Sequence, residues 1–96
     1  MTVLVHYEVT PPDSERFLRT AKKYAPLTEQ EGGRVIGLYR LESDPSRFLL
    51  LEEWASHQAM HIVSEKYGDD FNREAGTEGV EWETKVWTPV EAEERA

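Results

Sequence analysis

The sequence predicts an α+β domain of the ferredoxin-like type, with the element order β-α-β-β-α-β. Three observations support this fold class. Segments 2–10, 34–42, 47–55 and 80–90 have the apolar patterning of strands. Two longer segments between them carry apolar residues at helical spacing. The short spacer between the second and third strands indicates a hairpin, so we expect one antiparallel sheet with both helices on one face.

The first strand and the first helix follow from local patterns. The strand alternates so that one face carries Val3, Val5, Tyr7 and Val9. The turn that follows contains Asp13 and Ser14, either of which can cap a helix. Apolar residues then recur with helical spacing along that helix. We expect Pro26 to kink it and the Glu-Gly-Gly segment 31–33 to end it.

The same kinds of local pattern predict the elements of the second half of the chain. On the second strand, parity places Val35, Gly37, Tyr39 and Leu41 on one face. The turn 43–46 and the third strand follow, and Ser56 can cap the second helix. The apolar stripe of that helix contains Met60, Val63, Tyr67 and Phe71. We expect Gly68 to end or break the helix and Pro89 to mark the end of the last strand.

The sheet face that the helices do not cover is also predicted to be apolar. Its candidates are Leu4, Ile36, Leu38, Leu49, Leu51 and Trp87. A patch of this size is seldom left in water, and a chain of 96 residues can bury only a modest core by itself. We therefore expect a homodimer in which two copies stack sheet on sheet.

Composition excludes several classes of function. The formal charge of -8 argues against nucleic acid and anionic membranes as partners, because both attract a basic surface. The chain has no cysteine, so it has neither a disulfide framework nor a thiolate site. We see no signal peptide or membrane span and expect a cytoplasmic protein. We expect one domain over residues 1–90 and a charged tail over 91–96.

Two stretches, EGGRVIGLYRL and RFLLLEEWASHQAM, resemble the antibiotic biosynthesis monooxygenase family of the dimeric α+β barrel superfamily. The resemblance extends from Val3 to Val90 and is carried by Glu31, Gly33, Leu38, Tyr39, Glu52 and Trp54. It implies a dimeric α+β barrel with a pocket between the helices and the sheet of each subunit. Known members include cofactor-independent oxygenases of phenols and quinols, heme-degrading enzymes and proteins without known activity.

The chain departs from the family pattern at two positions. Val63 stands where the family usually carries a histidine, nine residues after the tryptophan that ends the strand. Val5 stands where the heme-degrading and phenol-oxidising branches place an asparagine on the first strand. Heme degradation therefore ranks low among the functions that the resemblance implies.

His57 and His61 are spaced so that both lie on one side of the second helix. Three interpretations remain open for them. They can be solvated residues at the edge of the helix, residues that line the pocket, or a zinc pair that needs a third ligand. The zinc-peptidase motif is absent, since Gln58 stands where that motif has a glutamate.

Oxidation of a small phenol or quinol by O2 needs a base and a hydrogen-bond donor for the resulting oxyanion. We predict His57 as the base and Tyr7, Tyr67 or the Trp54 indole as the donor. By analogy with the family, Glu52 is expected to tie the dimer or a backbone turn. We expect no cofactor and no metal. The pocket candidates are Val5, Tyr7, Phe17, Tyr24, Tyr39, Met60, His61, Val63 and Trp82.

One alternative for these aromatic residues is that they form only a core. A separate alternative for the function, suggested by the absence of the family histidine and of the first-strand asparagine, is a dimeric barrel that binds a small apolar ligand without catalysis.

Overall fold

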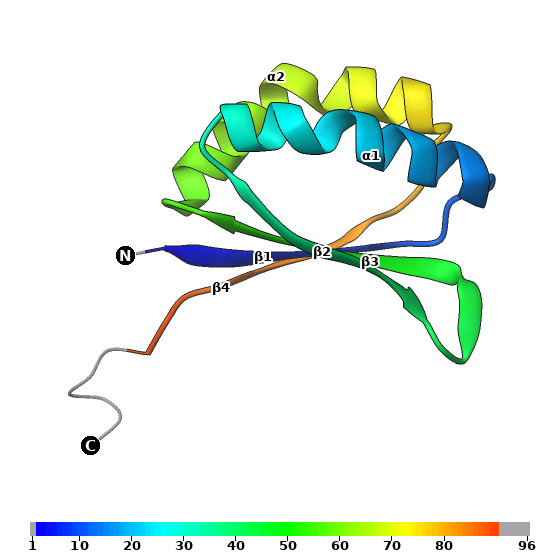
Figure 1. Ribbon diagram of the computed structural model, residues 1–96, viewed down its shortest axis with the longest axis horizontal. Helices are drawn as coiled ribbons and strands as arrows, with labels where there is room; N and C mark the ends of the chain where they lie inside the picture. The colour runs from blue at the N-terminus through cyan, green and yellow to red at the C-terminus, as the bar shows by residue number, and fades with distance from the viewer. Residues whose placement is uncertain (1, 91–96) are drawn as a thin grey trace.

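A computed structural model describes residues 2–90 of the chain. The elements in order are β1 (Val3–Val9), α1 (Ser14–Gln30), β2 (Arg34–Leu41), β3 (Asp44–Trp54), α2 (His57–Ala75) and β4 (Glu83–Trp87). The strands form one antiparallel sheet in the order β2-β3-β1-β4, and both helices cover the same face of it (Figure 1). The predicted ferredoxin-like fold is confirmed. The predicted tail 91–96 lies outside the described residues.

Both helices begin at the predicted caps. The Asp13 carboxylate accepts a hydrogen bond from the backbone N–H of Arg16 at 3.1 Å, which satisfies a free donor in the first turn of α1. The Ser56 hydroxyl accepts from the N–H of Ala59 at 3.0 Å and caps α2 in the same way. The helix α1 continues through Pro26 and ends at Gln30, directly before the Glu-Gly-Gly segment.

The expected end of α2 at Gly68 is wrong. The helix continues for two further turns to Ala75, and Gly76 forms its left-handed C-cap with φ 72°. A glycine inside a helix costs about 1 kcal/mol relative to alanine. Burial of Ala75 and packing of Phe71 against the core outweigh that cost, so the helix does not stop there.

The core between sheet and helices consists of two separate apolar clusters. One contains Val3, Val5, Trp54 and Met60, and the other contains Val9, Phe17, Phe48 and Ala75. On β3, Trp54 belongs to the first cluster and Phe48 to the second. The two residues between them that also face the helices, Leu50 and Glu52, belong to neither cluster. The candidate site lies in this gap.

A β-bulge in β2 changes which side chains face the helices. The register with β3 shifts between Val35 and Gly37, which leaves Ile36 as an extra residue. Beyond the bulge, Leu38 faces the helices and Tyr39 faces the other side, where it is 49% exposed. The parity prediction for both residues was wrong, because one inserted residue moves every following side chain to the opposite face.

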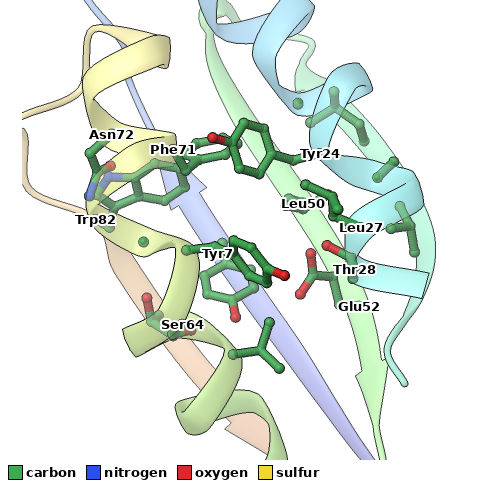
Figure 2. A pocket seen from close by; sticks show the side chains of 18 of the residues that line it. Tyr7, Tyr24, Leu27, Thr28, Leu50, Glu52, Ser64, Phe71, Asn72 and Trp82 are labelled. Atoms are coloured by element: carbon green, nitrogen blue, oxygen red, sulfur yellow. The ribbon is translucent and has the colours of Figure 1, made fainter. Parts of the chain in front are cut away.

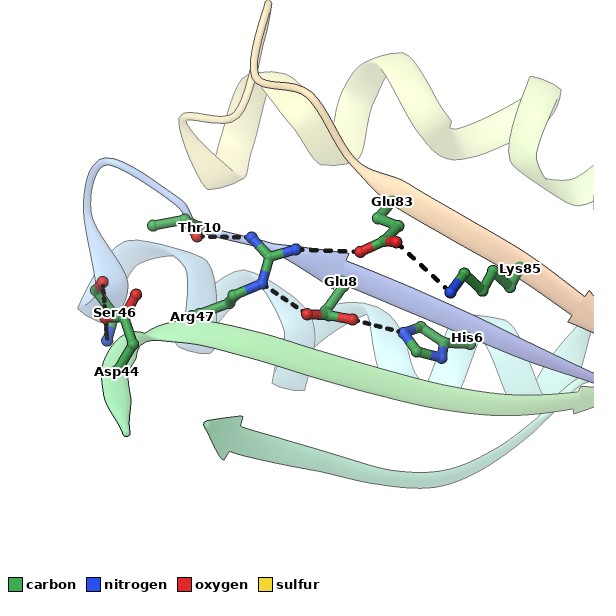
Figure 3. A network of polar contacts seen from close by, with 8 residues as sticks. All are labelled: His6, Glu8, Thr10, Asp44, Ser46, Arg47, Glu83 and Lys85. Carbon is green, nitrogen blue, oxygen red and sulfur yellow. Dashed lines mark hydrogen bonds and ion pairs between the residues drawn. The ribbon is translucent and has the colours of Figure 1, made fainter. Parts of the chain in front are cut away.

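The uncovered side of the sheet, here called the open face, carries a patch of apolar and aromatic side chains. They are Leu4, Ile36, Tyr39, Leu49, Leu51 and Trp87. A polar network also crosses this face (Figure 3). In it, Arg47 donates to Glu8 at 2.6 Å and to Glu83 at 3.3 Å, and His6 pairs with Glu8 at 2.8 Å. Within residues 2–90, neither helix is both long and apolar enough to cross a bilayer.

Candidate functional site

A pocket of about 540 Å³ lies between the two helices and the sheet. Six aromatic side chains line it: Tyr7, Tyr24, Trp54, Tyr67, Phe71 and Trp82. Four of them, all labelled in Figure 2, form a continuous row of rings: centroids are 5.3 Å apart for Tyr24–Phe71, 6.1 Å for Phe71–Trp82 and 6.3 Å for Trp82–Tyr7. An apolar pocket with a wall of rings suits a flat aromatic ligand.

Glu52 is the buried carboxylate of this pocket. It lies on β3, which is hydrogen-bonded to β1 and β2, and it is only 7% exposed. The indole Nε1 of Trp54 donates to Glu52 Oε1 at 2.9 Å. Among residues 2–90, no cationic side chain forms an ion pair with Glu52. Burial raises the pKa of Glu52, and the indole hydrogen bond partly opposes this rise.

The Tyr7 hydroxyl is the second polar group of the pocket with a perturbed acidity. Burial raises the pKa of Tyr7, the nearby charge of Glu52 raises it further, and the Ser64 hydroxyl acts in the opposite direction. A tyrosine with a raised pKa stays protonated at neutral pH. Tyr7 is therefore a neutral hydrogen-bond donor beside a buried carboxylate.

The Tyr67 hydroxyl is held by Glu31, the C-cap residue of α1. Tyr67 donates to Glu31 Oε2 at 2.8 Å, and Lys66 Nζ contacts the same oxygen at 2.9 Å. These contacts lower the pKa of Glu31, with the Lys66 hydrogen bond as the largest cause. The bridge joins the end of α1 to the middle of α2 at one side of the pocket, and it leaves the Tyr67 proton already engaged.

The structure brings six of the predicted site residues together in the pocket and keeps three others in the apolar clusters beside it. The six are Tyr7, Tyr24, Trp54, Val63, Tyr67 and Trp82. Val5, Phe17 and Met60 do not line the pocket, because they are buried in the two apolar clusters that bound it. Residues of the core and of the pocket share the same strand and helix faces, so periodicity alone does not separate them.

The remaining three predicted residues lie away from the pocket. His57 and His61 are exposed on α2, and His61 pairs with Glu65 at 3.1 Å. Across residues 2–90, no three histidine or carboxylate side chains gather as they would around a metal ion. Tyr39 points to the open face because of the bulge, so its predicted place in the pocket was wrong.

Sequence reasoning missed Glu52 as a pocket residue. By analogy with the family, Glu52 was expected to tie the dimer or a backbone turn; its side chain instead faces the helices and lines the pocket. The signal was present, because Glu52 has the same strand parity as Phe48, Leu50 and Trp54. A carboxylate at a position otherwise reserved for apolar residues marks a candidate functional group. Its neighbour Glu53 faces the open side, because adjacent residues of a strand point to opposite faces.

Comparison with known proteins agrees with this architecture. The family model for antibiotic biosynthesis monooxygenases matches residues 1–63. A proposed antibiotic biosynthesis monooxygenase from Nitrosomonas europaea has a similar structure (TM-score 0.74, 15% identity, 95% of this chain and 91% of that chain covered). So does a mutant form of SnoaB, a cofactor-independent oxygenase from Streptomyces nogalater (TM-score 0.67, 15% identity, 95% of this chain and 94% of that chain covered).

A protein of another family, a NIPSNAP family protein from Agrobacterium tumefaciens, is also similar (TM-score 0.69, 11% identity, 96% of each chain covered). At these identities the structural likeness shows the fold alone. No curated protein matches the chain significantly.

Proposed function

The chain belongs to the antibiotic biosynthesis monooxygenase family, and we propose that it is a cofactor-independent oxygenase of a flat phenol- or quinol-type substrate. The observation that carries this proposal is the buried carboxylate of Glu52 in a pocket walled by aromatic rings. The rings would hold the substrate, and the carboxylate would remove the proton that makes it reactive toward O2.

Glu52 is the proposed general base. Its raised pKa makes it a stronger base than an exposed glutamate. A general base works best when its pKa lies near the working pH, and burial shifts the pKa of Glu52 in that direction. Trp54 and Tyr67, predicted as donors, already donate to Glu52 and Glu31 respectively. Tyr7 is therefore the proposed donor to the oxyanion that forms when the substrate loses its proton.

The proposed reaction converts a ring CH2 group and O2 into a carbonyl group and water. Glu52 takes a proton from the ring carbon, and the carbanion passes one electron to O2. The resulting radical pair combines to a peroxide, which takes the proton back from Glu52. Removal of the second C–H proton then breaks the O–O bond and leaves a carbonyl group, and the departing hydroxide becomes water. The substrate supplies all the electrons, so no cofactor takes part in this scheme.

Oxygen uptake with an anthrone-type tricyclic compound and with a dihydroquinone tests the proposal. We expect turnover by the wild type and a loss of about 100-fold or more for Glu52→Gln, the usual effect of removing a general base. Glu53→Gln is the matched control, because Glu53 is the adjacent residue on the opposite face. His57→Gln tests the role first predicted for that residue, and we expect it to keep wild-type turnover because His57 lies outside the pocket.

Two outcomes would contradict this function. Wild-type turnover by Glu52→Gln would remove the base role. Binding of both compounds without any oxygen uptake would favour the alternative, a non-catalytic barrel that holds an apolar ligand. Circular dichroism of each variant separates a loss of chemistry from a loss of folding.

We also propose that a second copy of the chain covers the open face. Trp87 is 53% exposed, Ile36 is 38% exposed, and both lie on a sheet surface that no helix covers (Figure 1). Sedimentation of the wild type should give the mass of two chains, and Trp87→Lys should give the mass of one. Ile62→Lys is the control, since Ile62 is similarly exposed but lies on α2. A single-chain mass for the wild type at micromolar concentration would contradict the dimer.

A further inference from the structure

Trp54 makes a specific contact with the proposed base. The two residues lie two positions apart on β3, so their side chains share one face of the sheet. Trp54 is 3% exposed and packs in the cluster with Val3, Val5 and Met60, while its Nε1 reaches Glu52 Oε1 at 2.9 Å. The indole proton is therefore committed to the carboxylate and is not free to bind a substrate oxygen.

Gly33 lies directly against the same indole ring. A Cβ atom built at Gly33 would lie 2.6 Å from Trp54 Cζ2 and 2.8 Å from both Cε2 and Cη2. Its φ is not positive, so the backbone conformation at this position does not itself require glycine. The ring alone excludes a side chain here. The backbone N–H of Gly33 also donates to the carbonyl of Thr28 at 2.9 Å, which ties this contact to the last turn of α1.

We propose that Gly33 and Trp54 act together as positioning residues for Glu52: the space left by the missing side chain of Gly33 seats the indole, and the indole holds the carboxylate toward the pocket. This inference rests on the proposed base role of Glu52. It differs from the role predicted for Trp54 from the sequence, since the indole does not touch the substrate oxygen.

The expected effect on acidity follows from the hydrogen bond. The indole N–H stabilises the ionised carboxylate and lowers the pKa of Glu52 against the effect of burial. Trp54→Phe keeps an aromatic ring and removes the donor, so the pKa of Glu52 should rise further. Gly33→Ala should displace the ring, change the fluorescence of Trp54 and also raise this pKa. Trp87→Phe is the matched control, because Trp87 is on the open face.

The test is a 13C NMR titration of the Glu52 side-chain carboxyl in the full-length protein, with its signal assigned by its loss in Glu52→Gln. We expect upward shifts in Trp54→Phe and Gly33→Ala and none in Trp87→Phe. The pH at which kcat/KM falls on the acid side should move upward with the titration, while KM stays near the wild-type value.

The outcomes separate this inference from the proposed function. A Trp54→Phe protein whose Glu52 titrates as in the wild type would overturn the inference, even if turnover by the wild type is observed. Absence of turnover by the wild type would overturn the proposed function, while the titration would still decide the inference. Unchanged fluorescence and titration in Gly33→Ala would overturn the role of Gly33. Circular dichroism of each variant establishes that it is folded.

Discussion

Arg16 fixes the end of α2 against the start of α1, and its removal gives a stability prediction that can be worked from two hydrogen bonds. Its Nε donates to the carbonyl of Glu74 at 2.7 Å, and its Nη2 donates to the carbonyl of Arg73 at 2.7 Å. Carbonyls in the last turn of a helix have no partner within the helix, and a cation there also interacts favourably with the helix dipole. The guanidinium therefore satisfies two acceptors that would otherwise rely on water.

The magnitude follows from the exposure of these contacts. A hydrogen bond from a charged donor contributes about 1.5–3 kcal/mol at a buried site. The Arg16 contacts are solvent-exposed, so we reduce this to about 1–2 kcal/mol for the two together. For a domain of this size, each kcal/mol shifts Tm by about 4–8 °C. We therefore expect Arg16→Met to lower Tm by about 5–15 °C.

Thermal unfolding followed by circular dichroism measures this effect, with all proteins at one concentration because association raises Tm. Arg19→Met is the matched control. It changes the charge equally on an exposed position of α1, and among residues 2–90 Arg19 takes part in no side-chain hydrogen bond or ion pair. Faster amide exchange in the last turn of α2 should accompany the loss. Equal Tm values for the two variants would refute the reasoning.

Three further predictions concern the core, the bridge between the helices and the buried carboxylate. Phe17→Leu should lower the free energy of unfolding by about 1–2 kcal/mol in a urea titration, because Phe17 is fully buried at 5.3 Å from the Phe48 ring, and ligand affinity should not change. Glu31→Gln should lower Tm at pH 7, and the difference from wild type should shrink as the pH is lowered: the depressed pKa of Glu31 stabilises the fold above the unfolded-state pKa, and this stabilisation is lost as pH falls through the folded-state pKa. Glu52→Gln should be stabilising relative to wild type at pH 8 and less so at pH 4 in urea titrations, because the raised pKa of Glu52 penalises the folded state once the carboxyl ionises. For Glu31→Gln and for Glu52→Gln, a stability difference from wild type that does not vary with pH would contradict the prediction.

Local patterns in the sequence were sufficient to predict the elements of this fold. Helical spacing, the caps at Asp13 and Ser56, and the number and order of the strands each depend on a few neighbouring residues, and these are confirmed. Strand bounds were less accurate, since β3 begins at Asp44 inside the predicted turn 43–46. The errors at Gly68 and Tyr39 have non-local causes. The packing of α2 against the core keeps Gly68 within the helix, and the pairing with β3 creates the bulge that turns Tyr39 away. A local sequence pattern shows neither which strand will pair with β2 nor how α2 will pack against the core.

The pocket was less predictable than the fold for a related reason. Aromatic residues at core-facing positions were identified, but the sequence does not show where the core has a gap between its two clusters. The contact of Gly33 with the Trp54 ring joins residues from different elements, so spacing alone does not reveal it. Strand parity alone would have placed Glu52 on the helix-facing side, with Leu50 and Trp54. The analogy with the family instead suggested that it ties the dimer or a backbone turn.

Deprotonation of a substrate without O2 tests the central claim most directly, because it isolates the role of Glu52 from the later steps. An anthrone-type compound is mixed anaerobically with the protein above the pH at which Glu52 ionises, and the absorbance of the bound substrate anion is followed in a stopped-flow instrument. We expect the wild type and Glu53→Gln to form the anion rapidly and Glu52→Gln to form it about 100-fold more slowly or not at all. Anion formation at the wild-type rate in Glu52→Gln would contradict the account.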